Sequence, residues 1–128
     1  MKIAKTAALT TAGALLAVPT AVLVAAPAHA DVDRQGRCGP GSYEFSVDRE
    51  GRGFEVSADL DNLRPGSRWK VVLRQDGRVI GNVTRTADRE GDVELDRFAR
   101  NTAGKDRFVM RATPVGGGSG CSSTITVS

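Results

Sequence analysis

An alternating run bounded by two turn signals limits the possible folds of this chain more than any other feature. Apolar and basic side chains alternate through residues 68–74, which is the period of a half-buried β-strand. A Pro-Gly pair at 65–66 precedes the run, and an Asp-Gly pair at 76–77 follows it; both pairs favour tight turns. We therefore expect a central strand whose inward side chains are Trp69, Val71 and Leu73.

The same alternation recurs along the chain and predicts a seven-stranded antiparallel β-sandwich. We expect residues 31–41, which are polar and rich in glycine, to form a lead-in loop. Residues 99–106 are too few and too polar for a stable helix and predict a second loop. The predicted strands lie at about 43–47, 54–60, 68–74, 78–86, 92–96, 107–113 and 121–127.

The first thirty residues have the pattern of a secretory signal peptide. Lys2 and Lys5 precede an apolar, alanine-rich stretch at 7–26, and Ala28-His29-Ala30 has the form of a cleavage site. We therefore expect a secreted, extracellular product of 128 − 30 = 98 residues, without a retained membrane anchor. Its formal charge would be +3 − 2 = +1, because Lys2 and Lys5 leave with the leader.

The two cysteines are expected to form a disulfide in an oxidising compartment. Cys38 and Cys121 lie 121 − 38 = 83 residues apart, so the bond would tie the two terminal segments of the processed chain. The chain-entropy account gives a stabilisation of ~4–5 kcal/mol for such a loop. Two cysteines without a neighbouring histidine do not make a zinc pattern.

The chain resembles secreted actinobacterial immunoglobulin-like or fibronectin-III-like modules. The resemblance rests on Leu63-x-Pro65-Gly66-x-x-Trp69 before the central strand, on Asp76-Gly77, and on the 101–106 loop before the strand at 107–113. It covers residues 31–128 and implies one immunoglobulin-like sandwich domain. Antibody-type domains tie two inner strands and carry a tyrosine corner, whereas here the cysteines would tie the ends and no tyrosine lies near Arg107.

The residue inventory argues against an enzyme and against a cofactor. The only histidine, His29, lies in the predicted leader, and both cysteines are assigned to the disulfide, so Ser–His and Cys–His nucleophile pairs are excluded from the processed chain. Acidic residues at 88–94 offer oxygen ligands but lack the spacing of a calcium loop. We interpret them as a solvated turn and predict no metal site.

The predicted strand order separates the outward charges into two faces. We expect the strands of Trp69, Val79, Phe108 and Ile125 to share one sheet, and those of Phe45, Phe54 and Val93 to share the other. The first sheet would carry a basic face, defined as Arg68, Lys70, Arg74, Arg78, Arg107 and Arg111. The second would carry an acidic face, defined as Glu44, Glu55, Asp59, Asp92, Glu94 and Asp96.

These observations predict a non-catalytic secreted module that binds at or near a cell surface through the basic face. An anionic wall polymer or another extracellular protein would be the partner. Nucleic acid is disfavoured, because the outward residues provide no aromatic platform. Two alternatives stay open: a secreted protease inhibitor, and a small-ligand carrier similar to the apoproteins of chromoprotein antibiotics.

Overall fold

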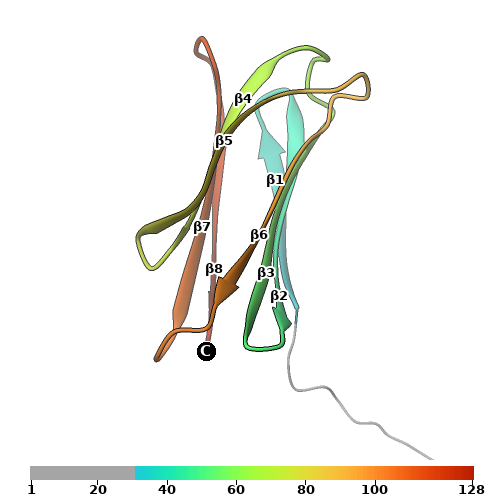
Figure 1. The fold of residues 1–128 in the computed structure, drawn as a ribbon. Helices are drawn as coiled ribbons and strands as arrows, with labels where there is room; N and C mark the ends of the chain where they lie inside the picture. Colours follow the sequence, from blue (N-terminus) through green and yellow to red (C-terminus); the bar gives the residue numbers. More distant parts are fainter. Residues whose placement is uncertain (1–30) are drawn as a thin grey trace, which may run out of the picture.

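Two antiparallel four-stranded sheets form the protein, and the computed structural model describes residues 31–128 of it (Figure 1). The predicted signal peptide at 1–30 lies outside the described residues. Within residues 31–128, no helix is long and apolar enough to cross a membrane. The strands are β1 (Val32–Cys38), β2 (Gly41–Glu50), β3 (Gly53–Asp61), β4 (Arg68–Gln75), β5 (Arg78–Thr86), β6 (Val93–Arg100), β7 (Asp106–Pro114) and β8 (Cys121–Val127).

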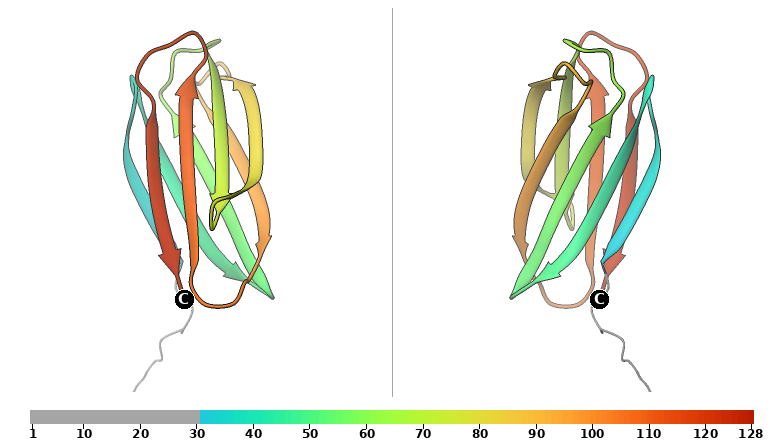
Figure 2. Two further views of the ribbon diagram at one scale, coloured as in Figure 1. Left: turned by 90° about the vertical axis from the view of Figure 1, so that its left-hand side faces the viewer. Right: turned by 90° about the vertical axis from the view of Figure 1, so that its right-hand side faces the viewer.

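The predicted division of the strands between two sheets is confirmed. One sheet has the order β1-β2-β3-β6 and the other the order β5-β4-β7-β8, and Figure 2 shows the outer side of each sheet in turn. Inward side chains from both sheets meet in one core, because strand residues alternate between the two faces of a sheet. Phe54 of β3 and Phe108 of β7 pack edge to face across the core, with ring centroids 5.3 Å apart.

The expectation of seven strands is wrong, because the segment predicted as a lead-in loop is strand β1. Its register with β2 runs without a break from Val32 opposite Val47 to Cys38 opposite Gly41. The backbone of β2 provides the partner groups, so the pairing needs little apolar alternation in β1 itself. The predicted loop at 99–106 also begins later than expected, since β6 continues to Arg100, which pairs with Gly53.

The predicted disulfide between Cys38 and Cys121 is present. Cys38 ends β1 and Cys121 begins β8, and these are the edge strands of opposite sheets. Cys38 is fully buried, so the bond joins the core as well as the strands. The disulfide therefore links the two layers along one side of the sandwich, where neither sheet has a further strand.

Both turns predicted around the central strand are confirmed by their backbone angles. Asp76 and Gly77 have φ values of 51° and 87°, and two positive values at the centre of a two-residue loop define a type I′ hairpin. Gly66 has a φ of 86°, and the Ser67 amide donates to the Arg64 carbonyl at 3.0 Å. That combination is a type II turn, in which glycine supplies the positive angle at the third position.

Trp69 belongs to the core, as its strand position predicts. Its side chain is 2% exposed, and Val71 and Leu73 on the same side of β4 are also buried. The indole Nε1–H donates to the Ser67 hydroxyl at 3.1 Å, so the buried polar atom is satisfied.

A buried polar network anchors the opposite end of β4. The Gln75 side-chain amide donates to the Arg100 carbonyl at 2.7 Å and to Asp106 Oδ1 at 3.0 Å. The Thr102 hydroxyl donates to the same carboxylate. Gln75 and Asp106 are 4% and 1% exposed, and the network fixes the β6–β7 connection against the end of the β5-β4-β7-β8 sheet.

Candidate functional site

The basic face lies on the outer side of the β5-β4-β7-β8 sheet. Arg68, Lys70, Arg107 and Arg111 are exposed, and Arg74 is half-buried. These four strands contain a single carboxylate, Asp106, and it is buried in the Gln75 network. The strands therefore present cations on the outer surface without an exposed carboxylate of their own. The neighbouring acidic side chain is Asp76 of the β4–β5 turn, which accepts the Arg107 amide at 2.9 Å.

Arg78 differs from the other predicted members of the basic face. Its register partner is Gln75, whose side chain is buried, so Arg78 belongs to the inner row of β5. The side chain is nevertheless exposed, because Arg78 stands at the end of the hairpin. A register shift between Leu73 and Arg74 leaves Ile80 as the extra residue in β5 and displaces the residues that follow the turn.

Hydroxyl side chains and valines share the outward positions between the cations, since Arg74 lies between Val79 of β5 and Val109 of β7. Lys70 lies between Thr84 of β5 and Thr113 of β7, and Arg111 lies beside Ser122 of β8. The aromatic residues of this sheet, Trp69 and Phe108, occupy the inner side. The basic face therefore combines positive charge with hydroxyl groups near Lys70 and Arg111 and with valines near Arg74, and its strands offer no aromatic surface for stacking.

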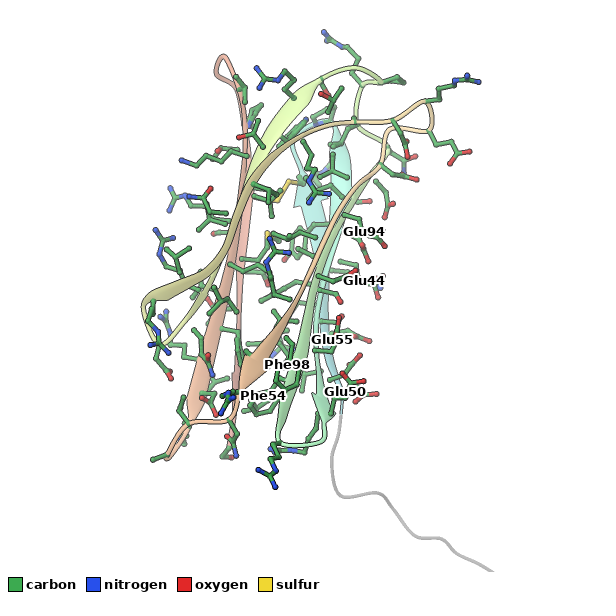
Figure 3. The ribbon with its side chains drawn as sticks, viewed as in Figure 1. Glu44, Glu50, Phe54, Glu55, Glu94 and Phe98 are labelled. Atoms are coloured by element: carbon green, nitrogen blue, oxygen red, sulfur yellow. A yellow bond between two sulfur atoms is a disulfide. The ribbon has the colours of Figure 1, made fainter. Side chains whose placement is uncertain are left out.

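The acidic face lies on the outer side of the other sheet, and its carboxylates stand directly opposite one another. Glu44, Asp59 and Glu94 form one row across β2, β3 and β6. Like charges in such cross-strand positions repel. Figure 3 shows Glu44, Glu55 and Glu94 projecting from the sheet on the side away from β4 and β7.

Burial, together with this crowding, raises the pKa of carboxyl groups on the acidic face. Burial first, and then the charges of Glu94 and Asp96, raise the pKa of Asp59 to about 6. Burial is also the leading cause of the raised pKa values of Glu55 and Asp92. The acidic face therefore loses part of its negative charge in mildly acidic solution.

Four further carboxylates adjoin the acidic face and were not part of its prediction. They occupy outward register positions opposite Ser46, Glu55, Gly53 and Ser42. Burial and the charges of Asp31 and Asp33 raise the pKa of one of them, Asp48. The alternation of β2 and β3, continued to the ends of these strands, is the signal that would have found three of the four. The added residues are Asp33, Asp48, Glu50 and Asp61.

The acidic segment between β5 and β6 forms a turn, as predicted. Asp88 Oδ1 accepts the backbone amides of Glu90 at 2.9 Å and Asp92 at 3.0 Å. This carboxylate therefore holds the turn together through backbone hydrogen bonds. Carboxylate oxygens of the three acidic residues lie within 4.8 Å of one another.

A hollow of about 430 Å³ lies at the disulfide end of the sandwich. The Gly39-Pro40 turn, the segment around Ser67 and the glycine-rich loop at 117–119 line it. Trp69 contributes to the lining, but its side chain is almost wholly buried. The hollow therefore lies between loops at one end of the sandwich and does not enter the space between the sheets.

Comparisons with protein families, with curated proteins and with solved structures found no match for this chain.

Proposed function

We propose that this protein is a non-catalytic, secreted immunoglobulin-like module that binds anionic polymers at the cell surface through the basic face. The fold supports the immunoglobulin-like assignment, because connections pass from sheet to sheet after β3, β5 and β6, as in sandwiches of that class. The disulfide supports an oxidising, extracellular location.

One observation carries the proposal: the strands of the β5-β4-β7-β8 sheet present exposed cations and no exposed carboxylate. A surface of one charge sign attracts an oppositely charged polymer and releases its counterions on contact. The formal charge of residues 31–128 is only +1, as +3 less Lys2 and Lys5. The segregation of charge between the sheets therefore creates this potential, and the excess charge contributes little.

The acidic face restricts a polyanion to one side of the sandwich. Its carboxylates occupy the opposite side of the sandwich, where they repel a polyanion. A polymer chain would therefore be held on one side only, with the basic face turned toward it. A partner protein with an acidic surface would meet the same face.

Retention on an anionic resin tests the proposal. We expect the purified protein to bind a sulfated-polysaccharide resin at low salt and to elute as salt rises. A variant with three neutralised members of the basic face should elute at clearly lower salt than the parent protein. A control with three neutralised loop cations loses the same formal charge, but its elution should shift to lower salt by a smaller amount. The variant is Lys70→Gln, Arg74→Gln, Arg111→Gln, and the control is Arg52→Gln, Arg89→Gln, Lys105→Gln. Equal elution of the two proteins would remove the proposed function.

A further inference from the structure

The register of β4 and β7 arranges five cations at a regular step along the sheet. Val72 pairs with Arg111, so Arg111 lies midway between Lys70 and Arg74 along the sheet. The Asp76 amide donates to the Arg107 carbonyl at 2.8 Å, which places Arg107 one step beyond Arg74. We name this series the cation ladder; in order along the sheet it is Arg68, Lys70, Arg111, Arg74 and Arg107.

Strand geometry fixes the length of the step. Each residue of an antiparallel strand advances the chain by about 3.4 Å, so two residues advance it by ~7 Å. Successive members of the cation ladder are two residue positions apart in the shared register of β4 and β7. The cation ladder therefore places one basic residue every ~7 Å along the strand direction over a length of ~27 Å, alternating between β4 and β7 after Lys70.

We propose that the ligand is a phosphodiester polymer with one negative charge for every six backbone bonds, such as a glycerol-phosphate chain. This inference rests on the proposed function and specifies its ligand. An extended chain advances about 3.3–3.6 Å for every three backbone bonds, so six bonds place successive phosphates ~7 Å apart. An extended chain of this kind can meet every member of the cation ladder with consecutive charges.

Other polyanions have a different charge spacing. A 1,4-linked glycan with a carboxylate on every second sugar separates its charges by ten bonds, or ~11 Å by the same reckoning. Inorganic polyphosphate places them only two bonds apart, at ~2–3 Å. Neither spacing matches the cation ladder over its whole length.

Single-stranded nucleic acid also has six bonds between phosphates, so spacing alone does not separate it from a glycerol-phosphate chain. Proteins that bind single strands stack the bases on aromatic side chains. Trp69 and Phe108 face the core. The outer positions beside Lys70 and Arg111 carry Thr84, Thr113 and Ser122, and those beside Arg74 carry Val79 and Val109. Hydroxyl side chains suit a polyol backbone, which is why we infer the glycerol-phosphate chain.

A relocated charge tests the spacing without changing the net charge. In Arg111→Thr, Thr113→Arg the cation moves one step along β7 into the row of Lys70 and leaves a gap in the cation ladder. Loss of one phosphate contact should weaken binding to a poly(glycerol phosphate) chain about four-fold at 0.15 M salt, from a counterion slope of ~0.7 per contact. The unaltered fluorescence of Trp69 would verify that the variant is folded.

A second relocation is the matched control. In Arg111→Ser, Ser122→Arg the cation moves sideways to β8 and keeps its position along the sheet. We expect binding within about two-fold of the parent protein, because the axial step is preserved. Equal affinities for the parent and both relocated variants would overturn the inference but leave the proposed function intact, since that function requires only the charge.

Ligand length and type give an independent test. Affinity for glycerol-phosphate oligomers should rise steeply up to about five repeats, the number that fills the cation ladder, and more slowly beyond. At matched charge number, an alternating uronic-acid glycan, inorganic polyphosphate and an oligothymidylate should each bind more weakly.

Equal or tighter binding of the glycan or of polyphosphate would overturn the spacing argument. Tighter binding of the oligothymidylate would overturn the choice of a glycerol-phosphate chain. Failure of the triple neutral variant to weaken any of these interactions would overturn the proposed function itself.

Discussion

Val72 of β4 pairs with Arg111 of β7, and this pairing sets the order of charges on the basic face. Val72 is only 8% exposed, yet it lies outside the core cluster and in the outward row of β4. Long basic side chains cover apolar surface with their stems while their charged ends remain in water. Val72 therefore provides an apolar surface among the cations, on which the stems of neighbouring basic side chains can lie.

A negative charge at Val72 should disrupt binding more than the removal of one cation. We expect Val72→Glu to weaken binding to a glycerol-phosphate polymer by at least ten-fold at 0.15 M salt, because it repels the ligand and neutralises neighbours. The control is Ser119→Glu, which adds the same charge to an exposed loop. Titration of the two variants side by side gives the comparison, and equal affinities would count against a ligand on the basic face.

Removal of the charge at Asp59, which is partly buried and faces other carboxylates, should stabilise the protein at neutral and basic pH. The pKa of Asp59 is raised from 3.8 to about 6 in the folded protein. The unfolded chain therefore binds fewer protons between these values, and the free energy of unfolding falls as pH rises through this range. Asp59→Asn removes this cost, which is about 1 kcal/mol after solvent screening.

The pH dependence of that stabilisation is the sharper observation. We expect the melting temperature of Asp59→Asn to exceed that of the parent by about 4–8 °C at pH 8 and to match it at pH 3.5. Glu90→Gln in the exposed β5–β6 turn is the control, with little change at either pH. A gain of the same size at both pH values would show that the cost of holding a charged carboxylate at this position is not its origin.

Substitution of either partner in the buried Gln75–Asp106 pair should lower the free energy of unfolding. Asp106→Leu leaves the Gln75 amide and the Thr102 hydroxyl short of an acceptor, so we expect a loss of about 2–3 kcal/mol in the free energy of unfolding. The double variant with Gln75→Leu should lose less than the sum of the single losses, by about 1 kcal/mol. Urea unfolding of the four proteins measures this coupling, and strict additivity would contradict it.

Trp69 provides a spectroscopic test of where ligands bind. As the only tryptophan of the chain, with a side chain 2% exposed, it should emit at short wavelength and resist quenching by acrylamide. Binding of a polymer to the outer side of β4 should leave this emission unchanged. A ligand in the hollow near Trp69, as a small-ligand carrier would hold, should instead shift or quench it, and such a change on polymer binding would contradict the proposed surface.

The sequence predicted the parts of the fold in which side-chain alternation and turn chemistry agree. Trp69, Val71 and Leu73 form an apolar side of period two, and the Asp76-Gly77 pair favours a type I′ turn. These local signals were sufficient to assign the central strand and its inner side. The outward positions then followed from parity, which is why five of the six basic residues lie in the outward row.

The remaining features depend on contacts between distant segments. β1 reads Val-Asp-Arg-Gln-Gly-Arg-Cys, with no apolar alternation, and it is a strand because its backbone pairs with β2. Gln75 and Asp106 lie 31 residues apart, and a polar side chain gives no sign of burial until its partner is known. Arg78 lies in the inner row and not in the predicted outward row, because the register between β4 and β5 is irregular. Composition does not reveal such an irregularity.

The salt dependence of polymer binding tests the central claim most directly. For a single-chain polyanion, the logarithm of the binding constant should fall with the logarithm of salt concentration at a slope of about −0.7 per phosphate contact. Five cations in contact predict a slope of about −3.5 for the parent protein and about −1.4 for Lys70→Gln, Arg74→Gln, Arg111→Gln. A slope near zero, or the same slope for both proteins, would contradict binding through the basic face.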